Sequence, residues 1–329
     1  MRRIAIWFLL LLWPWAALSD GLYPKLDDPV DQAVQRLNIM SQRDEAFEGF
    51  EYNNGYLAGR GCQAVSLANA VIATFGVEDR ETAADVVREA IGLLVLPGKQ
   101  GSTRIELTRL PLLMDAQLRA SQAEEYPALA KVIGGYDGKM LLPEQLEDLQ
   151  IMEALMREMD GAFVLTSRMT VHPDWTAMVE LVAQLEALGL TDARVCLSNV
   201  GVGSKDSDLP LSLGENGHYL TVMMHVGTFM REGRIYVLDS LPRALKGEES
   251  GLEHVLRQPY PFTQGWSEFA NMFSATRIRD TVIRLRLNDG DAWMRADTQE
   301  KAKVFARLTL FGPGVLMIST PQAEETRSN

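Results

Sequence analysis

Cysteine is scarce in this chain of 329 residues, which has only Cys62 and Cys196, and histidine occurs only four times. A disulfide-stabilised scaffold needs more cysteines at closer spacing, so the sequence contains no disulfide framework. HExxH motifs and pairs of CxxC motifs, the usual sequence signatures of zinc sites, are also absent. We therefore expect neither a bound metal nor an organic cofactor.

Basic residues are outnumbered as well. The chain has 32 lysines and arginines against 44 aspartates and glutamates, and its formal net charge is -12. Nucleic acids and anionic membrane surfaces bind proteins mainly through clustered positive charge. The composition therefore argues against both as partners.

Long apolar runs are confined to the N-terminus. Two arginines precede the apolar stretch from Ile4 to Leu12, and a break at Pro14 and small residues up to Ser19 follow. This stretch is shorter than the roughly 18 apolar residues of a membrane span, so we interpret residues 1–19 as a signal peptide cleaved after Ser19. A retained membrane anchor is the alternative. The mature protein is then expected to be secreted or periplasmic, and more acidic because it loses two arginines.

Residues 20–329 are expected to form a single α+β domain with a helix-rich insertion at about 80–190. Apolar residues at helical spacing predict helices over residues 81–96, 103–120, 142–159 and 175–188. Runs rich in β-branched residues predict strands over 162–171 and 193–200, and several strand-like runs follow Gly217. The ends, at residues 20–31 and 322–329, are expected to be loose.

Cys62 is the strongest candidate in the sequence for a catalytic residue. It stands between two glycines and an apolar run in the segment GYLAGRGCQAVSLANAVIATFG. This pattern predicts a helix that begins at the cysteine, with a face buried against the C-terminal sheet by Val65, Leu67, Ala68 and Val71 or Ile72. A thiol in the first turn of a helix lies near unpaired backbone N–H groups, which favour the thiolate.

A base and an orienting carboxylate are available later in the chain. His218 begins the run HYLTVMMHVG, and Asp239 ends the run RIYVLDSLP. If these runs form an antiparallel hairpin that turns near Thr228 and Phe229, His218 lies opposite Asp239, with Cβ atoms about 5 Å apart. A turn nearer Met230 is also possible and would change the register.

The other three histidines have simpler interpretations. His225 is expected on the strand face opposite to His218, which makes it a weaker candidate for the base. His172 precedes a proline and fits a turn, and His254 fits one position of an amphipathic helix. We expect structural or surface roles for these residues.

The segment around Cys62 resembles the nucleophile helix of papain-like cysteine peptidases in the broad sense, especially bacteriocin-leader peptidases and phytochelatin synthases. The segment GHYLTVMMHVGTFMREGRIYVLDSLP is similar to the His and Asp strands of those families and of ubiquitin C-terminal hydrolases, in the same chain order. The resemblance covers about 20 residues around Cys62 and about 25 around His218. It implies a papain-like α+β fold with Cys62 as nucleophile, His218 as general base and acid, and Asp239 as orienting carboxylate.

Two positions depart from the family pattern. The families usually have glycine directly after the cysteine and an oxyanion-donating glutamine several residues before it, whereas this chain has Gln63 and, six residues before Cys62, Tyr56. Asn54 or Asn53, aided by the backbone N–H of Cys62, could supply the oxyanion donor instead. Gln63 is a further candidate.

The sequence thus favours a thiol hydrolase or acyltransferase, similar to cysteine peptidases, that acts on a peptide or protein substrate. Resemblance to phytochelatin synthases implies the alternative of a γ-glutamyl transferase acting on thiol peptides. A catalytically inactive papain-like binding module is a second alternative. A disulfide between Cys62 and Cys196 would remove the nucleophile and leave a structural or binding protein.

Overall fold

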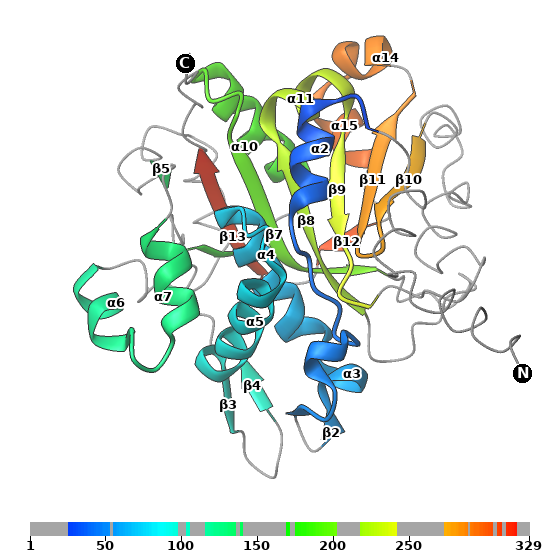
Figure 1. Ribbon diagram of the computed structural model, residues 1–329. Helices are drawn as coiled ribbons and strands as arrows, with labels where there is room; N and C mark the ends of the chain where they lie inside the picture. The colour runs from blue at the N-terminus through cyan, green and yellow to red at the C-terminus, as the bar shows by residue number, and fades with distance from the viewer. Residues whose placement is uncertain are drawn as a thin grey trace, which may run out of the picture.

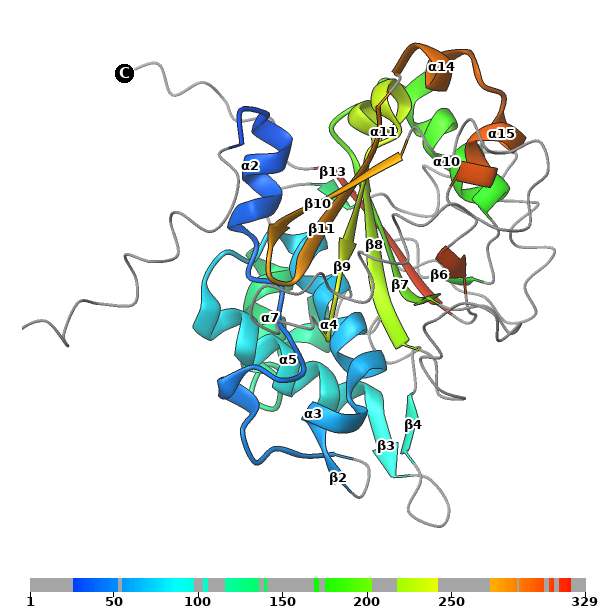
Figure 2. The same ribbon diagram turned by 90° about the vertical axis from the view of Figure 1, so that its right-hand side faces the viewer.

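The protein combines helices with an antiparallel sheet, as the α+β expectation requires. The computed structural model describes residues 26–52, 55–97, 103–105, 116–135, 139–140, 169–171, 175–202, 218–241, 273–288, 290–304, 308–310 and 314–320. The central sheet lies between two groups of helices, with α4 and α5 on one side and α10, α11 and α15 on the other (Figures 1 and 2).

The helices of the described residues are distributed along the chain. They are α2 (Pro29–Arg36), α3 (Leu57–Arg60), α4 (Cys62–Phe75), α5 (Arg80–Leu94), α6 (Ala116–Gln122), α7 (Pro127–Gly134), α10 (Trp175–Ala187), α11 (Val226–Glu232), α14 (Gly290–Arg295) and α15 (Thr298–Val304), with a 3-10 turn at Glu45–Phe47. Among the described residues, no helix is both long and apolar enough to cross a lipid bilayer.

The strands of the central sheet come mostly from the second half of the chain. Its main path runs β10 (Phe273–Arg279), β11 (Val282–Leu287), β9 (Ile235–Leu238), β8 (His218–His225), β7 (Arg194–Val202), β13 (Gly314–Thr320) and β5 (Lys139–Met140). Outside this path, β12 (Leu308–Leu310) pairs with β7, and β6 (Met169–Val171) pairs with β13. Two small hairpins complete the described strands: β1 (Glu51–Tyr52) with β2 (Gly55–Tyr56), and β3 (Val95–Pro97) with β4 (Thr103–Ile105).

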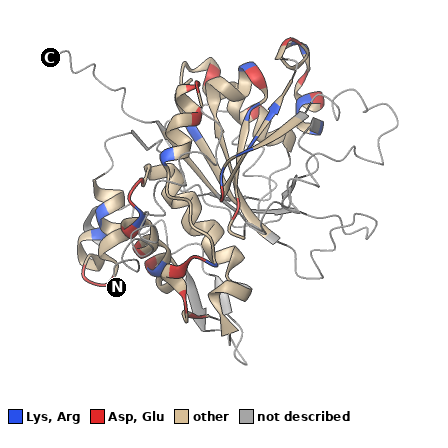
Figure 3. Cartoon of the chain, turned by 45° about the vertical axis from the view of Figure 1, so that its right-hand side comes forward, with Lys and Arg blue, Asp and Glu red and all other residues tan. Residues whose placement is uncertain are grey.

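Both faces of the sheet are buried, each in its own hydrophobic cluster. Side chains alternate between the two faces along a strand, so Met223 and Tyr236 pack with α4 and α5, while Val222 and Val237 pack with α10 and α11. Most of the sheet and all of α4 lack charged residues, which lie mainly on the outer helices and on β10 and β11 (Figure 3). Because both faces of the sheet are buried, the sequences of its central strands are nearly continuous apolar runs.

Several elements agree with the sequence expectations. The expected helices at 81–96 and 175–188 correspond to α5 and α10, and the expected strand at 193–200 corresponds to β7. The strand-like runs after Gly217 contain β8, β9, β11 and β13. The expected helix at 142–159 and most of the expected strand at 162–171 lie outside the described residues.

Three expectations are wrong. The helix expected over 103–120 is interrupted, because residues 103–105 form β4 and pair with β3, and α6 begins only at Ala116. The helix expected to reach residue 96 ends at Leu94, where the chain enters the same hairpin. The segment 20–31 is not loose throughout, since α2 begins at Pro29 after an N-cap at Asp28.

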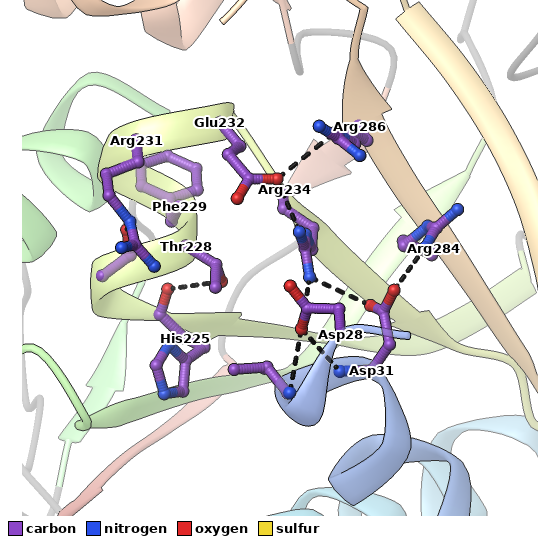
Figure 4. Close-up of polar contacts among 12 residues, drawn as sticks. Asp28, Asp31, His225, Thr228, Phe229, Arg231, Glu232, Arg234, Arg284 and Arg286 are labelled. Carbon is purple, nitrogen blue, oxygen red and sulfur yellow. Dashed lines mark hydrogen bonds and ion pairs between the residues drawn. The ribbon is translucent and has the colours of Figure 1, made fainter. Parts of the chain in front are cut away.

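An ion network attaches α2 to the sheet (Figure 4). Asp31 of α2 is 1% exposed and accepts hydrogen bonds from the hydroxyl of Tyr236 at 2.7 Å and from Arg234 at 3.2 Å. Its second carboxylate oxygen pairs with Arg284 on β11. Burial and the negative charge of Asp31 raise the pKa of Tyr236, so Tyr236 stays a neutral donor.

Arg234 links the network to two further carboxylates. Its guanidinium lies 2.9 Å from Asp28 and 2.5 Å from Glu232, and Glu232 also pairs with Arg286 at 3.2 Å. Burial alone would lower the pKa of Arg234, but hydrogen bonds to Asp28, Tyr236 and Glu232 outweigh it and raise that pKa. A buried guanidinium with this many acceptors remains charged at every physiological pH.

We predict that Asp31→Ala lowers the free energy of unfolding by about 3 to 5 kcal/mol, because it leaves the buried charge of Arg234 with too few acceptors. Urea denaturation followed by circular dichroism measures the change. As a control, Glu78→Gln removes the exposed ion pair with Arg36 and should cost less than about 1 kcal/mol. Equal effects of the two substitutions would contradict a structural role for the network.

Candidate active site around Cys62

Cys62 is the first residue of α4, as the sequence predicts. It forms no disulfide and is only partly buried, whereas every residue of α4 from Ala64 to Phe75 is buried. The face that carries Val65, Leu67, Ala68 and Val71 contributes to the core between α4 and the sheet. The thiol therefore lies at the positive end of a buried helix dipole.

The entry into α4 depends on a glycine. The short helix α3 leads directly to Gly61, whose N–H donates to the Leu57 carbonyl at 2.8 Å. A Cβ at position 61 would lie 2.3 Å from Leu57 Cδ1 and 2.7 Å from the Leu57 carbonyl oxygen. Gly61 thus permits a close approach of backbone to side chain, while its φ of -86° is ordinary.

α4 lies beside β8 and runs in the same direction. The Thr221 hydroxyl donates to the Ser66 carbonyl at 2.6 Å near the start of both elements. Near their other end, the Arg194 guanidinium lies 3.5 Å from the Ala73 carbonyl, and Arg194 pairs with His225 in the sheet. Cys62 therefore lies at the end of the sheet where β8 begins with His218.

The predicted register of the two strands is wrong by two residues. Thr221 pairs with Leu238 and Val222 with Val237, and continuing this register places Asp239 beside Leu220 rather than His218. The expected tight turn near Thr228 and Phe229 is absent, because α11 occupies that connection. A shift of two residues keeps positions 218 and 239 on one face of the sheet, as diagonal neighbours about 7 to 8 Å apart. By strand alternation that face is the one of Val222 and Val237, which packs on α10 and α11, opposite the face that α4 covers.

Asp239 lies at the same end of the sheet and is held firmly. Its side chain is 3% exposed, and its backbone N–H donates to the Thr281 carbonyl at 2.8 Å. One carboxylate oxygen accepts the backbone N–H of Leu241 at 2.9 Å. The next residue, Ser240, donates its hydroxyl to the Tyr219 carbonyl at 2.9 Å, which holds the end of β9 against the start of β8.

The remaining predicted residues have different outcomes. The backbone of His218 is paired with Val202, but its side chain lies outside the described part, as do Asn53 and Asn54. Gln63 is partly exposed in the first turn of α4. His172 and His254 also lie outside the described residues.

His225 ends β8, at the opposite end of the strand from His218. Burial lowers the pKa of its imidazole, and its Nδ1 is buried without a hydrogen-bond partner among the described residues. Its position favours the neutral form and places it away from the Cys62 end of α4. This agrees with the expectation that His225 is the weaker base candidate.

Gln42 is a residue of this region that the sequence did not indicate. It is 2% exposed, its backbone N–H donates to the Ser240 carbonyl at 2.7 Å, and its side-chain Nε2 donates to the Ala58 carbonyl at 2.8 Å. It therefore joins the turn before Cys62 to the strand end after Asp239. Both contacts span long stretches of chain, so no local motif could have revealed them.

Cys196 differs from Cys62 in every respect that matters for reactivity. It lies in the middle of β7, is fully buried, and is free rather than bonded to Cys62. Burial raises the pKa of its thiol to about 11, although a hydrogen bond with Thr74 lowers it. The hypothesis of a structural disulfide between the two cysteines is thus not supported, because neither of them forms a disulfide.

Neither models of protein families nor curated proteins nor solved structures provide a match for this chain. Within the described residues, no group of three or more His, Cys, Asp or Glu side chains could hold a metal ion. The chemistry of the region must therefore be argued from its own residues.

We predict that Gly61→Ala lowers the free energy of unfolding by about 1 to 3 kcal/mol, because the new methyl group overlaps Leu57. Gly59→Ala is the matched control, since a Cβ there meets no atom within 4 Å in the described part of the chain. The control should be neutral or stabilise α3 by up to about 1 kcal/mol. Thermal melting of both variants tests this, and equal melting temperatures would contradict the close approach at Gly61.

We predict that iodoacetamide at about pH 8 modifies Cys62 of the native protein and leaves Cys196 untouched. That pH is well below the raised pKa of Cys196, about 11, so Cys196 is in the unreactive thiol form. Peptide mapping by mass spectrometry identifies the modified residue, and labelling in urea should reach both cysteines. Comparable labelling of both residues in the native protein would contradict the buried position of Cys196.

Proposed function

We propose that the protein is a thiol hydrolase or acyltransferase in which Cys62 is the nucleophile, His218 the general base and acid, and Asp239 the orienting carboxylate. The observation that carries this proposal is the placement of a partly exposed cysteine, which forms no disulfide, at the first residue of a buried helix. The starts of α4 and β8 and the end of β9 occupy one end of the sheet. Positions 218 and 239 belong by strand alternation to the face opposite α4, so the proposed triad requires the imidazole and the carboxylate to meet the thiol around the end of the sheet.

The first step is acylation. The imidazole of His218 takes the proton of the Cys62 thiol, and the thiolate attacks the carbonyl carbon of an amide, forming the S–C bond. The imidazolium then gives its proton to the departing amine as the C–N bond breaks. Asp239 accepts a hydrogen bond from the imidazole and stabilises its charged form.

The second step releases the acyl group. Water or an amine, deprotonated by His218, attacks the thioester carbonyl and regenerates the thiol. Water gives hydrolysis, and an amine gives transfer. A peptide-like amide is the proposed substrate class, because peptides and proteins present the carbonyl and the amine leaving group that these steps require.

We also propose that the protein acts outside the cytoplasm after removal of residues 1–19. The N-terminal pattern of two arginines, a short apolar stretch and small residues supports this location. A nucleophilic cysteine is compatible with an oxidising compartment here, because Cys196 is buried beside Thr74, near the other end of α4, and cannot reach Cys62 without unfolding of the core.

We predict that Cys62→Ala and His218→Ala each abolish cleavage of fluorogenic peptide amides by the wild-type protein, while Cys196→Ser leaves the rate nearly unchanged. Asp239→Asn should have a milder effect than either, because the amide oxygen can still accept the Leu241 N–H and orient an imidazole, although the charge is lost. Each rate is compared at equal protein concentration, with circular dichroism as the check on folding.

A second readout does not require the correct substrate. The rate of Cys62 alkylation by iodoacetamide, measured against pH, should show a thiolate well below pH 8.5, the value of an ordinary thiol. His218→Ala should move that profile towards the ordinary value. A wild-type profile centred near pH 8.5 and unaffected by His218→Ala would overturn the enzyme proposal and favour a binding module.

A further inference from the structure

Gln42 holds two segments together that the proposed reaction needs at a fixed distance. On one side its side-chain amide donates to the carbonyl of Ala58 in α3, at 2.8 Å. On the other side its backbone N–H donates to the carbonyl of Ser240 at 2.7 Å, directly after Asp239. α3 ends one residue before Gly61, and Cys62 follows it.

The hydrogen bond from Gln42 to Ala58 stabilises α3 from outside the helix. α3 is only four residues long, from Leu57 to Arg60, and so short a helix has little stability of its own. The Gln42 side chain, which donates to the second residue of α3, therefore restrains the position of that helix. Because α3 continues into α4 through Gly61, a shift of α3 would also move the first turn of α4.

Gln42 itself has little freedom to move. It is 2% exposed, and Met40, two residues earlier, is held through both its backbone N–H and its carbonyl by the Asn69 side chain, each at 2.9 Å. Asn69 belongs to α4, two turns beyond Cys62. The segment from Met40 to Gln42 thus contacts α4 near its middle and α3 just before α4.

The side-chain oxygen of Gln42 shows that a polar residue at this position has an energetic cost. This oxygen, Oε1, is buried and has no hydrogen-bond partner among the described residues. A leucine or methionine of similar size would fill the same space without this unpaired acceptor. The amide is therefore best explained by what its Nε2 does at Ala58.

We propose that Gln42 is a positioning residue for Cys62, which fixes the turn before α4 relative to the end of β9 that carries Asp239. This inference rests on the proposed function, since it assigns Gln42 a role in the same site. Gln42 acts through backbone carbonyls of Ala58 and Ser240 and is not itself a catalytic residue.

The test compares Gln42→Met with Gln42→Glu. Methionine keeps the volume and loses the donor, whereas a buried glutamate has a raised pKa and regains an O–H donor for the Ala58 carbonyl when it is protonated. Gln35→Met is the matched control, because the Gln35 side chain also donates to a backbone carbonyl, that of Ile278 at 3.1 Å, but on α2. The readout is the rate of Cys62 alkylation by iodoacetamide between about pH 5 and pH 8, relative to the wild-type protein at each pH.

We expect Gln42→Met to change this rate by about tenfold at every pH, in line with the effect of small displacements in active sites. Gln42→Glu should match the wild-type rate near pH 5 and approach the Gln42→Met rate near pH 8. Gln35→Met should follow the wild-type protein throughout. Circular dichroism at each pH confirms that the compared variants are folded.

The outcomes separate this inference from the proposed function. If wild-type Cys62 is activated and Gln42→Met does not alter its rate, the positioning role is overturned and the enzyme proposal stands. If wild-type Cys62 behaves as an ordinary thiol but Gln42→Met still changes its rate while Gln35→Met does not, positioning stands and the enzyme proposal fails. A Gln42→Glu variant whose relative rate does not depend on pH would also overturn the positioning role.

Discussion

The burial of α4 from Ala64 to Phe75 is the constraint on which the rest of the structure depends. Apolar packing is not directional, so it cannot by itself decide how far this uncharged helix is shifted along its axis. Polar side chains make that decision: Ser66 bonds to Thr221, Asn69 to Met40, and the Thr74 carbonyl accepts the Ser319 hydroxyl at 3.2 Å. Because an unpaired buried polar group costs about 1 to 3 kcal/mol, any other axial position of α4 is penalised.

The N-terminal segment, residues 28–40, contacts both the sheet and α4. At one end α2 is attached to the sheet through Asp31 and its partners on β9 and β11. Further along, the Thr281 hydroxyl donates to the Ile39 carbonyl at 2.8 Å, and Asn69 then binds Met40. The segment therefore connects the sheet with the middle of α4, and its apolar residues Val34, Leu37, Ile39 and Met40 belong to the core that α4 shares.

Features that depend on neighbouring residues in the chain could be predicted from the sequence. The helix that begins at Cys62 follows from its apolar spacing and from the glycine before it. The register of β8 and β9 could not be predicted, because α11 depends on distant partners: the N–H groups of Val226 and Gly227 donate to the carbonyls of Ala193 and Thr191. A run such as HVGTFM is rich in β-branched and aromatic residues and reads as strand, until these tertiary contacts favour a helical turn.

The same helix sets the opposite properties of the two cysteines. Cys62 is the first residue of α4, where the positive end of the helix dipole favours an anionic group. Near its C-terminal end, Thr74 contacts Cys196, and the surrounding core keeps that thiol out of water and protonated. A charged sulfur is costly in the core and stabilised at the helix start. Of the two cysteines, only Cys62 is thus partly exposed at the start of a helix, and the packing of α4 against the sheet decides its position.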